Sequence, residues 1–445
     1  MATDPVRSIR ATEQESPVVP DLQAALTRLA ALPPSPSGTC LTVSFDWSID
    51  GSEPGRLPAP APKRSQERAM RGETGAPRRP GWQQMQRELH ALVESHGPRG
   101  ETYDALAADL ARITEFVETQ LEPNVNGAFI VADGQQGVFE AIPLDVAPTP
   151  SLVLESVPAL RPLVHASEDY PTFAVVNANQ QEANVWVIER LGWSENIQVA
   201  SDGYPRHQST GGLNAQRYQN RANERVEAFA RTVAEQVNRL FMESSTPPDY
   251  LILSDEEPMA TAIAEHLHKE VSPKVLGRVV LGKDPLPTEI AAIVAPMIEA
   301  AERQEEIDAV QKVADNVGAQ TLGIAGAVDT LRALANGQVQ MLVMNDDFTA
   351  TGWADYTLPL FGLGEIPAEH PAGGDVANLR VTKLEDEAVR LAVLNGGTVE
   401  LIQTTEPLSA DSDVPRAGGE IPRAAAATAL DGLGGIGAVL RYDIA

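Results

Sequence analysis

The sequence predicts an α/β protein built from three units in succession. Helical patterns, with apolar residues every three to four positions, alternate along the chain with short apolar runs of strand length. The chain has 445 residues, of which 43% are apolar. This is long enough for about two to four domains that each bury a core. No period typical of a solenoid is present.

The first unit is expected over residues 20–160, behind a disordered lead over residues 1–19. Its helices carry one apolar face, and its strands alternate or form short apolar runs. The expected helices span residues 21–32, 82–97 and 102–121, and the expected strands span residues 40–47, 127–133 and 137–144. The segment 50–80 is rich in Pro, Gly and Arg. Such a segment cannot build a core, so we expect a mobile basic loop or a solvated linker there.

The second unit is expected over residues 165–310. Two strands that can pair with each other open it, and two further strands alternate with helices. The expected strands span residues 172–179, 183–190, 249–255 and 277–283. The expected helices span residues 213–241, 257–271 and 287–317. Pro296 lies inside the last of these helices and is expected to bend it.

The third unit is expected over residues 318–445. Helices with glycine stops alternate with apolar strands, which again indicates α/β layers. The expected helices span residues 325–337 and 385–397, and the expected strands span residues 338–344 and 398–403. The stretch 345–356 is acidic and aromatic. We expect a surface loop there, with a contact to a protein partner as the alternative.

Charge and cysteine content limit the possible classes of function. The chain has 62 acidic against 34 basic residues, a net charge of −28, which argues against a surface uniformly coated by nucleic acid. A local basic patch remains possible, and its binding would weaken with salt. Cys40 is the only cysteine, so no internal disulfide can form and a reducing compartment fits. Without a secretory signal or a long apolar run, we expect a cytoplasmic protein with neither a membrane nor DNA as partner.

The stretch 208–236, QSTGGLNAQRYQNRANERVEAFARTVAEQ, places two glycines before a helix that is rich in arginine. At 100° per residue, one face of this helix is apolar. That face holds Val226, Phe229, Ala230, Val233, Val237, Leu240 and Phe241. Arg217, Arg221 and Glu224 fall on the opposite face, with Arg225 at its edge. The apolar face should pack on a sheet, so the arginines should point outward, close to the glycines.

Gly211 and Gly212 allow backbone conformations that a Cβ would forbid, and they let the chain approach another molecule closely. Their flanking residues are polar apart from Leu213. An ordinary mobile loop followed by a solvated helix face has the same pattern, because mixtures of Arg and Glu usually decorate surfaces. Both interpretations stay open from the residues alone.

The stretch GGLNAQRYQNRANERVEAFARTVAE, residues 211–235, resembles the central domain of the archaeal and eukaryotic class-one peptide chain release factors. In that family a GGQ loop precedes a helix with an arginine, an aromatic residue and further charges. The matching positions here are Gly211, Gly212, Arg217, Tyr218, Glu224 and residues 231–235. The closing stretch GLGGIGAVLRY, residues 432–442, is similar to the end of the third domain in release factors and in the Pelota group. The group that fits is their bacterial relatives, which include peptidyl-tRNA hydrolase-like and ribosome-hibernation members.

The resemblance implies a ribonuclease H-like central domain and a small α/β sandwich at the C-terminus, as in release factors. It implies a factor that binds the ribosomal A site and inserts its GG loop toward the peptidyl transferase centre, in ribosome rescue or hibernation. The ribosome is the implied partner, and a translational GTPase is a further candidate partner. Two alternatives remain: an active peptidyl-tRNA ester hydrolase that releases nascent chains, and a non-ribosomal scaffold that retains the fold.

Leu213 departs from the family, because it stands where the family has the glutamine of GGQ. The backbone N–H at this position can still donate to an oxyanion, but a leucine side chain cannot orient water. The candidate catalytic residues are Gly211, Gly212, Leu213 and Gln216, with Gln208 as a further nearby amide. The candidate RNA-binding residues are Arg206, Arg217, Arg221 and Arg225. No NIKS-like segment is found, so stop-codon reading is not expected.

Other patterns give weaker signals. His266 and His268 are two apart on an expected helix and therefore face different directions, so we expect no metal site there. The closing glycine motif lacks the lysine of a nucleotide-binding loop, and no cofactor is expected. Ser254 and Asp255 end a strand before a helix, where we expect them to act as a helix cap.

Overall fold

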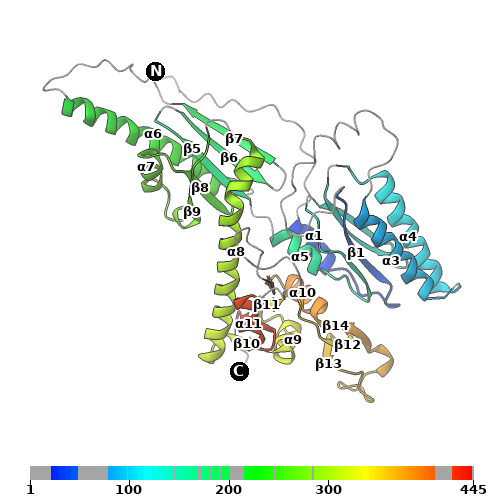
Figure 1. Cartoon of the computed structure of the whole chain (residues 1–445). Coiled ribbons are helices and arrows are strands. Elements are labelled where there is room, and N and C mark those ends of the chain that lie inside the picture. The colour runs from blue at the N-terminus through cyan, green and yellow to red at the C-terminus, as the bar shows by residue number, and fades with distance from the viewer. Residues whose placement is uncertain are drawn as a thin grey trace. The chain divides into compact units, whose positions relative to one another are not determined.

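The computed structural model describes residues 22–48, 79–97, 99–123, 125–144, 146–168, 172–180, 182–189, 192–200, 215–244, 247–282, 285–405 and 423–442. The chain divides into two compact units. One contains Tyr170–Glu302, and the other contains Pro20–Asp169 together with Arg303–Ala445. Helices and mixed sheets occur in both units, so the α/β class is confirmed (Figure 1).

The unit formed by Pro20–Asp169 and Arg303–Ala445 contains an antiparallel sheet of order β3-β2-β1-β4. Its strands are β1 (Cys40–Asp46), β2 (Gly127–Asp133), β3 (Val138–Leu144) and β4 (Ser151–Glu155). The helices α3 (Pro80–Ser95) and α4 (Glu101–Thr119) cover one face (Figure 1). Leu41, Val43 and Phe45 alternate along β1 and are buried in the core beneath these helices. The first three strands and both helices are as predicted, whereas β4 was not.

Two further helices of this region are α1 (Leu22–Ala30), as predicted, and α5 (Arg161–Glu168), which was not predicted. They lie near each other beside β1 in Figure 1. Behind β1, the backbone N–H of Ala159 donates to the hydroxyl of Thr42 at 3.1 Å. The sequence of α5 is short and polar, and Pro residues surround it, so no helical pattern predicts this helix. Packing stabilises it more than helix propensity does.

The same unit contains a second sheet of order β10-β16-β11-β15. Its strands are β10 (Gly323–Ala325), β11 (Val339–Asn345), β15 (Thr398–Ile402) and β16 (Ile436–Leu440). The helices next to it are α9 (Ala327–Ala335), α10 (Leu384–Leu394), α11 (Ala425–Asp431) and the second half of α8 (Pro287–Gly318). Val310 and Val313 of α8 share one core with Val343 of β11. Helices packed on a mixed sheet form the small C-terminal α/β layer structure that we expected.

The closing glycine motif makes the turn from α11 into β16. Gly434 and Gly435 have φ values of 95° and 73°, which only glycine adopts without strain. Gly437 then lies directly beneath α8: a Cβ there would stand 2.8 Å from Cγ1 of Val313 and 2.9 Å from the carbonyl oxygen of Ile324. The motif is therefore a helix-to-strand turn, opposite in order to the strand-to-helix turn of a nucleotide-binding loop.

A third, small sheet of order β13-β12-β14 was not predicted. It consists of β12 (Thr351–Asp355), β13 (Leu360–Leu363) and β14 (Arg380–Lys383). The expected surface loop over 345–356 is therefore wrong for the residues of β12, most of which are buried. The indole of Trp353 lies over Gly362, where a Cβ would meet it at 2.3 Å. Asp355 and His370 form a buried pair at 2.9 Å, so the sheet is held by a long-range contact that no local pattern reveals.

The unit within Tyr170–Glu302 is built on a sheet of order β7-β6-β5-β8-β9. The strands are β5 (Phe173–Ala178), β6 (Glu182–Glu189), β7 (Gly192–Ala200), β8 (Tyr250–Ser254) and β9 (Val275–Val279). The first three pair antiparallel, while β5, β8 and β9 are parallel. This order and these directions fit the expected ribonuclease H-like domain. β7 was not predicted, and the strand expected over 277–283 lies at Val275–Val279 instead.

Helices cover both faces of this sheet. The cores place α6 (Ala215–Glu243) and α7 (Met259–Glu265) on one face and the first half of α8 on the other (Figure 1). Pro296 lies inside α8, and the helix continues on both sides of it. The helix expected over 257–271 is shorter than predicted, because it ends at Glu265 and a short 3₁₀ turn follows at Ser272–Lys274.

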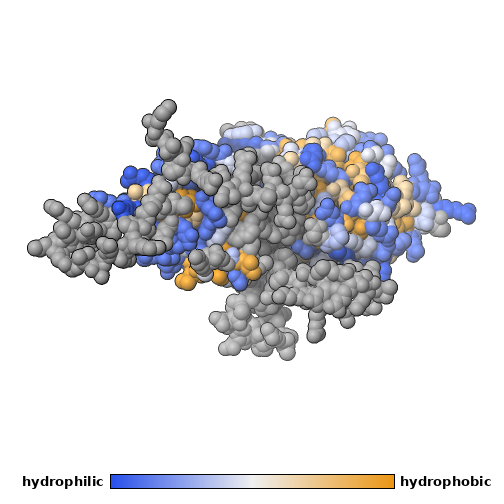
Figure 2. All heavy atoms as spheres, turned by 90° about the horizontal axis from the view of Figure 1, so that it is seen from above, coloured by the Kyte–Doolittle hydropathy of each residue, from blue (hydrophilic) through white to orange (hydrophobic). Residues whose placement is uncertain are grey.

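The surface of the described residues is mostly hydrophilic in Figure 2, with hydrophobic side chains gathered in smaller areas. No helix among the described residues is both long and apolar enough to span a membrane.

Glu306 of α8 is a buried carboxyl group next to the end of β15. It accepts a hydrogen bond from the backbone N–H of Gln403 at 3.3 Å and lies 3.6 Å from Arg303. Burial raises the pKa of Glu306 from 4.5 to about 7, with Glu400 and Asp346 adding to the shift and Arg303 opposing it. Ionised Glu306 is therefore a cost to the folded chain.

We expect the Glu306→Gln variant to be more stable than the parent at high pH. Because the folded pKa lies above the unfolded value, this group's contribution to stability is complete below pH ~4.5 and is lost as the pH rises through about 7. At 1.36 kcal/mol per pKa unit, the gain at pH ~8 should approach about 2–3 kcal/mol and vanish near pH ~4. Denaturant unfolding at both pH values measures it. The exposed neighbour Glu305→Gln serves as the control, and an equal gain at both pH values would contradict the assignment.

We also expect Gly437→Ala to destabilise the chain by about 1–3 kcal/mol, because the added methyl group overpacks the space beneath α8. Gly318→Ala is the matched control, since a Cβ there meets nothing within 4 Å. Thermal unfolding should separate the two variants. If both variants unfold at the same temperature as the parent, the close approach at Gly437 does not affect stability.

Candidate functional site

The glycine loop itself lies outside the described residues, which stop at Ala200 and resume at Ala215. The predicted site residues in that gap are Arg206, Gln208, Gly211, Gly212 and Leu213. The structure therefore describes only the two elements that flank the loop. One end is the last residue of β7, and the other is the first residue of α6.

The helix after the loop is confirmed, since α6 runs from Ala215 to Glu243 over 29 residues. Gln216, Arg217, Tyr218 and Arg221 lie on its first two turns; their backbone is helical, and their side chains are outside the described part of the structure.

Arg225 is exposed, and so is its neighbour Glu224. Arg217, Arg221 and Arg225 follow one another at intervals of four residues, so they share one side of the helix. Among these three arginines, the structure describes the side chain of Arg225, which points outward as expected.

The apolar face of α6 is buried as predicted. Its buried residues are Phe229, Ala230, Val233, Ala234, Val237, Leu240 and Phe241. They pack against Val176 of β5, Val185 of β6 and Leu253 of β8. At about 25 cal/mol per Å² of apolar surface, each large side chain here contributes on the order of 1.5–3 kcal/mol. This face fixes how α6 lies on the sheet, and thereby where the loop returns.

Polar contacts add to this attachment. Glu227 and His266 lie 2.6 Å apart between α6 and the end of α7. The amide of Asn238 donates to the carbonyl of His266 at 3.2 Å and accepts from the N–H of His268 at 2.8 Å. The ring of His268 accepts from the N–H of Glu270, so the two histidines serve different partners. Among the described residues, no group of three or more His, Cys, Asp or Glu side chains could hold a metal ion.

The strand directions place four strand ends at one edge of the sheet. β6 pairs antiparallel with both β5 and β7, and β8 and β9 run parallel to β5. The carboxyl ends of β5, β7, β8 and β9 therefore meet at the same edge. The glycine loop leaves from this edge after Ala200, which pairs with Glu182. In open α/β sheets this is the edge where ligands bind, at the point where the connections diverge.

A polar pocket of about 290 Å³ lies at this edge. Its lining residues are Asn177, Asn179, Glu182, Asn184, Glu256, Leu281 and Gly282. The amide of Asn177 donates to the carbonyl of Gly282 at 3.0 Å, which joins the end of β5 to the residues after β9. The sequence prediction missed this pocket. Its only local signal is asparagine in otherwise apolar strands, at Asn177 and Asn184.

Ser254 and Asp255 do not cap a helix, which corrects the prediction. Pro258 occupies the N-cap position of α7 without a side-chain hydrogen bond. The buried hydroxyl of Ser254 instead accepts from the N–H of Ala178 at 3.1 Å, and so ties the ends of β8 and β5 together. This bond therefore holds the carboxyl ends of β5 and β8 together beside the pocket.

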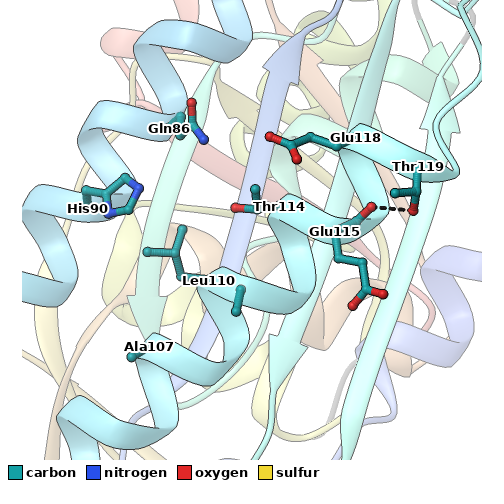
Figure 3. A pocket seen from close by; sticks show the side chains of 9 residues that line it. Gln86, His90, Ala107, Leu110, Thr114, Glu115, Glu118 and Thr119 are labelled. Carbon is teal, nitrogen blue, oxygen red and sulfur yellow. Dashed lines mark hydrogen bonds between the residues drawn. The ribbon is translucent and has the colours of Figure 1, made fainter.

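A second hollow, of about 510 Å³, lies between α3 and α4 (Figure 3). Its lining residues are Gln86, His90, Ala107, Leu110, Ala111, Thr114, Glu115, Glu118 and Thr119. The hydroxyl of Thr119 donates to the carbonyl of Glu115 at 2.6 Å, as a residue within a helix does. The hollow is an open groove between the surfaces of two helices.

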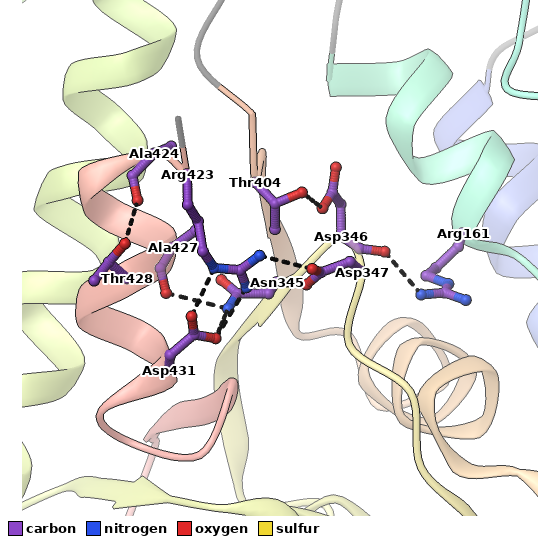
Figure 4. A network of polar contacts seen from close by, with 10 residues as sticks. All are labelled: Arg161, Asn345, Asp346, Asp347, Thr404, Arg423, Ala424, Ala427, Thr428 and Asp431. Carbon is purple, nitrogen blue, oxygen red and sulfur yellow. Dashed lines mark hydrogen bonds and ion pairs between the residues drawn. The ribbon is translucent and has the colours of Figure 1, made fainter. Parts of the chain in front are cut away.

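The stretch after β11 forms a closed polar network (Figure 4). Arg423 pairs with Asp347 at 2.7 Å and with Asp431 at 2.6 Å, and the first pair lowers the pKa of Asp347. Thr405 and Arg423 face each other as a β-bridge, so the chain positions on either side of residues 406–422 are adjacent. The guanidinium of Arg423 is paired with two carboxylates, so this network stabilises the fold at this place.

Arg161 of α5 donates to the backbone carbonyls of Asp346 and Phe348 at 3.1 and 3.2 Å. It also lies 3.3 Å from the carboxylate of Asp386 on α10. The acidic stretch after β11 is thus bound within its own unit, at Asp346 to Phe348. The alternative of a protein contact through this stretch stays a prediction.

Part of the chain matches a known protein family. Residues 158–306 match the model of bacterial archaeo-eukaryotic release factor family 10. That range includes the whole glycine loop, α6 and the polar pocket.

Similar solved structures include Archaeoglobus fulgidus Pelota, with 15% identity over 71% of this chain and 80% of that chain, at a TM-score of 0.33. S. cerevisiae Dom34, described as a translation termination-like factor, is 12% identical over 72% of this chain and 80% of that chain, at a TM-score of 0.36. The C-terminal domain of the Methanosarcina mazei peptide chain release factor is 17% identical over 35% of this chain and 94% of that domain, at a TM-score of 0.24. The part of the chain that spans residues 158–306 is therefore similar to the bacterial archaeo-eukaryotic release factors of family 10.

Proposed function

We propose that this protein binds the ribosomal A site and directs the loop between Ala200 and Ala215 toward the peptidyl transferase centre, in ribosome rescue or hibernation. One observation carries the proposal. A double-glycine loop emerges from the edge of a sheet and returns into a helix whose apolar side is buried on that same sheet. Gly211 and Gly212 relieve the loop of Cβ constraints, which suits insertion into a narrow RNA cavity.

In this proposal Arg217, Arg221 and Arg225 contact RNA phosphates, and Arg206 adds a contact from within the loop. Guanidinium groups bind phosphates through charge-assisted hydrogen bonds, which position a protein on RNA without reading its sequence. Arg225 is exposed on the polar side of α6, as this role requires. The chain is strongly negative as a whole, so RNA should bind at local basic patches such as this one.

The loop should occupy the centre without hydrolysing the ester. Leu213 supplies a backbone N–H but no carboxamide, so one group that could orient water is missing. Peptidyl-tRNA hydrolysis is the second candidate. It is favoured by Gln216, which stands in the first turn of α6 next to the loop and could supply an amide from a different position. A translational GTPase that delivers the protein is compatible with either candidate.

We expect the double change Arg217→Glu and Arg221→Glu to weaken ribosome binding by about tenfold or more at ~0.15 M salt. Each lost phosphate contact should also reduce the slope of log K against log salt by about 0.7–0.9. Co-sedimentation with ribosomes across a salt series measures both quantities. Arg239→Glu is the control, because it is exposed near the far end of the same helix. Unchanged affinity and slope in the double variant would remove the arginine side from the proposal.

We expect the parent protein to release no labelled peptide from a stalled ribosome complex above background, and Leu213→Gln to gain release. The reason is that the substitution restores the family amide at the loop tip. Release by the parent that falls with Gln216→Ala would establish the hydrolase candidate instead. Ribosome co-sedimentation of each variant ensures that a change in release is not a change in binding.

A further inference from the structure

Helix α10 is buried over most of its length, although it begins with three acidic residues. Glu385, Asp386 and Glu387 are only 4%, 5% and 0% exposed. Helix α1 packs against α10, and α5 packs against α1, all within one compact unit. We call the contacts between residues 22–168 and α10 the α10 interface. Acidic side chains are almost never fully buried unless they are paired, so this interface has to supply charges of the opposite sign.

Two arginines supply these charges. Arg161 of α5 lies 3.3 Å from the carboxylate of Asp386 and 4.0 Å from that of Glu385. Arg390 of α10 donates to Glu387 at 2.6 and 3.0 Å, and it also donates to the carbonyl of the last residue of α1 at 3.1 Å. Each arginine therefore joins the two sides of the α10 interface by charge-assisted hydrogen bonds or an ion pair.

A further acidic residue, Glu155, faces this interface from the end of β4. Leu152 and Leu154 of the same strand pack in the core beneath α3 and α4. Because side chains alternate along a strand, Glu155 points to the face of the sheet away from those two helices. The charged groups that act on it there all belong to β14 and α10.

Burial raises the pKa of Glu155 from 4.5 to about 7. Lys383 opposes this rise, whereas Asp386 and Glu385 add to it. If the α10 interface opened, the carboxyl group would regain water and lose these neighbours, so its pKa would return toward its ordinary value. The closed interface therefore holds a proton on Glu155 more tightly than the open one, and ionisation of Glu155 favours opening.

Other titratable groups surround this carboxyl group. Burial raises the pKa of Asp386 and of Glu387, so their ionisation also favours opening. Burial raises the pKa of Cys40, the cross-strand partner on β1, to about 12 and also raises that of Tyr356, so both stay neutral near pH ~7. Burial lowers the pKa of His165 on α5 from 6.5, so its protonation opposes closure in acid. A variant that removes only the β4 carboxyl group separates its effect from theirs.

We propose that the α10 interface is a proton-sensitive contact, which is closed while Glu155 carries a proton and opens more often once Glu155 ionises beside Asp386. The reason is that a carboxylate at the end of β4 must lose water next to the first turn of α10, where two arginines already serve three acids. The contribution of Glu155 to closure is complete below pH ~4.5, is lost as the pH rises through about 7, and changes little above pH ~8. This regulatory contact goes beyond the proposed ribosome binding and does not depend on it.

The test is hydrogen exchange of the full chain, followed by mass spectrometry between pH ~6 and ~9 and corrected for the intrinsic rate of each amide. Exchange of buried helical amides reports how often their surroundings open. We expect opening of α1 and α10 in the parent to rise about tenfold between pH ~6 and ~8 and then to level off, as a pKa raised from 4.5 to about 7 requires. Helix α4, which packs on β2 and α3, should not respond.

Three variants sharpen the test. Glu155→Gln should abolish the rise and keep α1 and α10 at pH ~8 at least as closed as in the parent at pH ~6. Lys383→Gln removes the cation that lowers the pKa of Glu155, so the rise should shift to higher pH. Glu122→Gln, exposed in the same segment, should behave like the parent. Circular dichroism confirms that each variant folds.

A parent whose α1 and α10 open equally at pH ~6 and ~8 overturns the inference. So does a rise in Glu155→Gln as large as in the parent, because another group would then be responsible. A rise that includes α4 shows loosening of the whole unit and overturns a contact confined to the α10 interface. A rise that stays in place in Lys383→Gln contradicts the position given to Glu155.

Discussion

The burial of one side of α6 on the central sheet is the constraint on which the candidate site depends. Phe229, Val233 and Val237 lie in the core, so the helix cannot rotate without exposing them. The exposed position of Arg225 and the return point of the glycine loop follow from that burial. The two elements that flank the loop, β7 and α6, belong to the same sheet and to the helix packed on it.

The sequence was informative wherever a pattern repeated over more than two turns or one full strand. Strands such as β1 and β5 and the long helices α4, α6 and α8 were predicted to within a few residues. The missed elements are short or polar and depend on distant partners. β12 contains glycine and aspartate, and it is held by Gly362 and His370 rather than by its own composition. Helix α5 and strand β4 lie among prolines, where local propensity opposes what packing stabilises.

The candidate site was accessible to the sequence only in part. The double glycine and the arginine spacing pointed to α6, and the backbone there is as expected. The pocket was not found, because its residues come from β5, β6, the turn after β8 and the turn after β9. Their convergence is a property of strand order, which no single stretch of sequence encodes. Ser254 shows the same limit: its position before a helix suggested a cap, whereas its hydroxyl serves the neighbouring strand.

The bridge between Thr405 and Arg423 has a practical consequence. Arg423 is anchored by two carboxylates, and Arg303 donates to the carbonyl of Thr405 at 2.9 Å, so both flanks are tethered independently of what joins them. Lengthening a connection between fixed points costs little, since doubling it adds only about 0.6 kcal/mol of closure entropy. This position is therefore a suitable insertion point for a fluorophore or an affinity tag, and relatives of this chain should tolerate wide variation in length there.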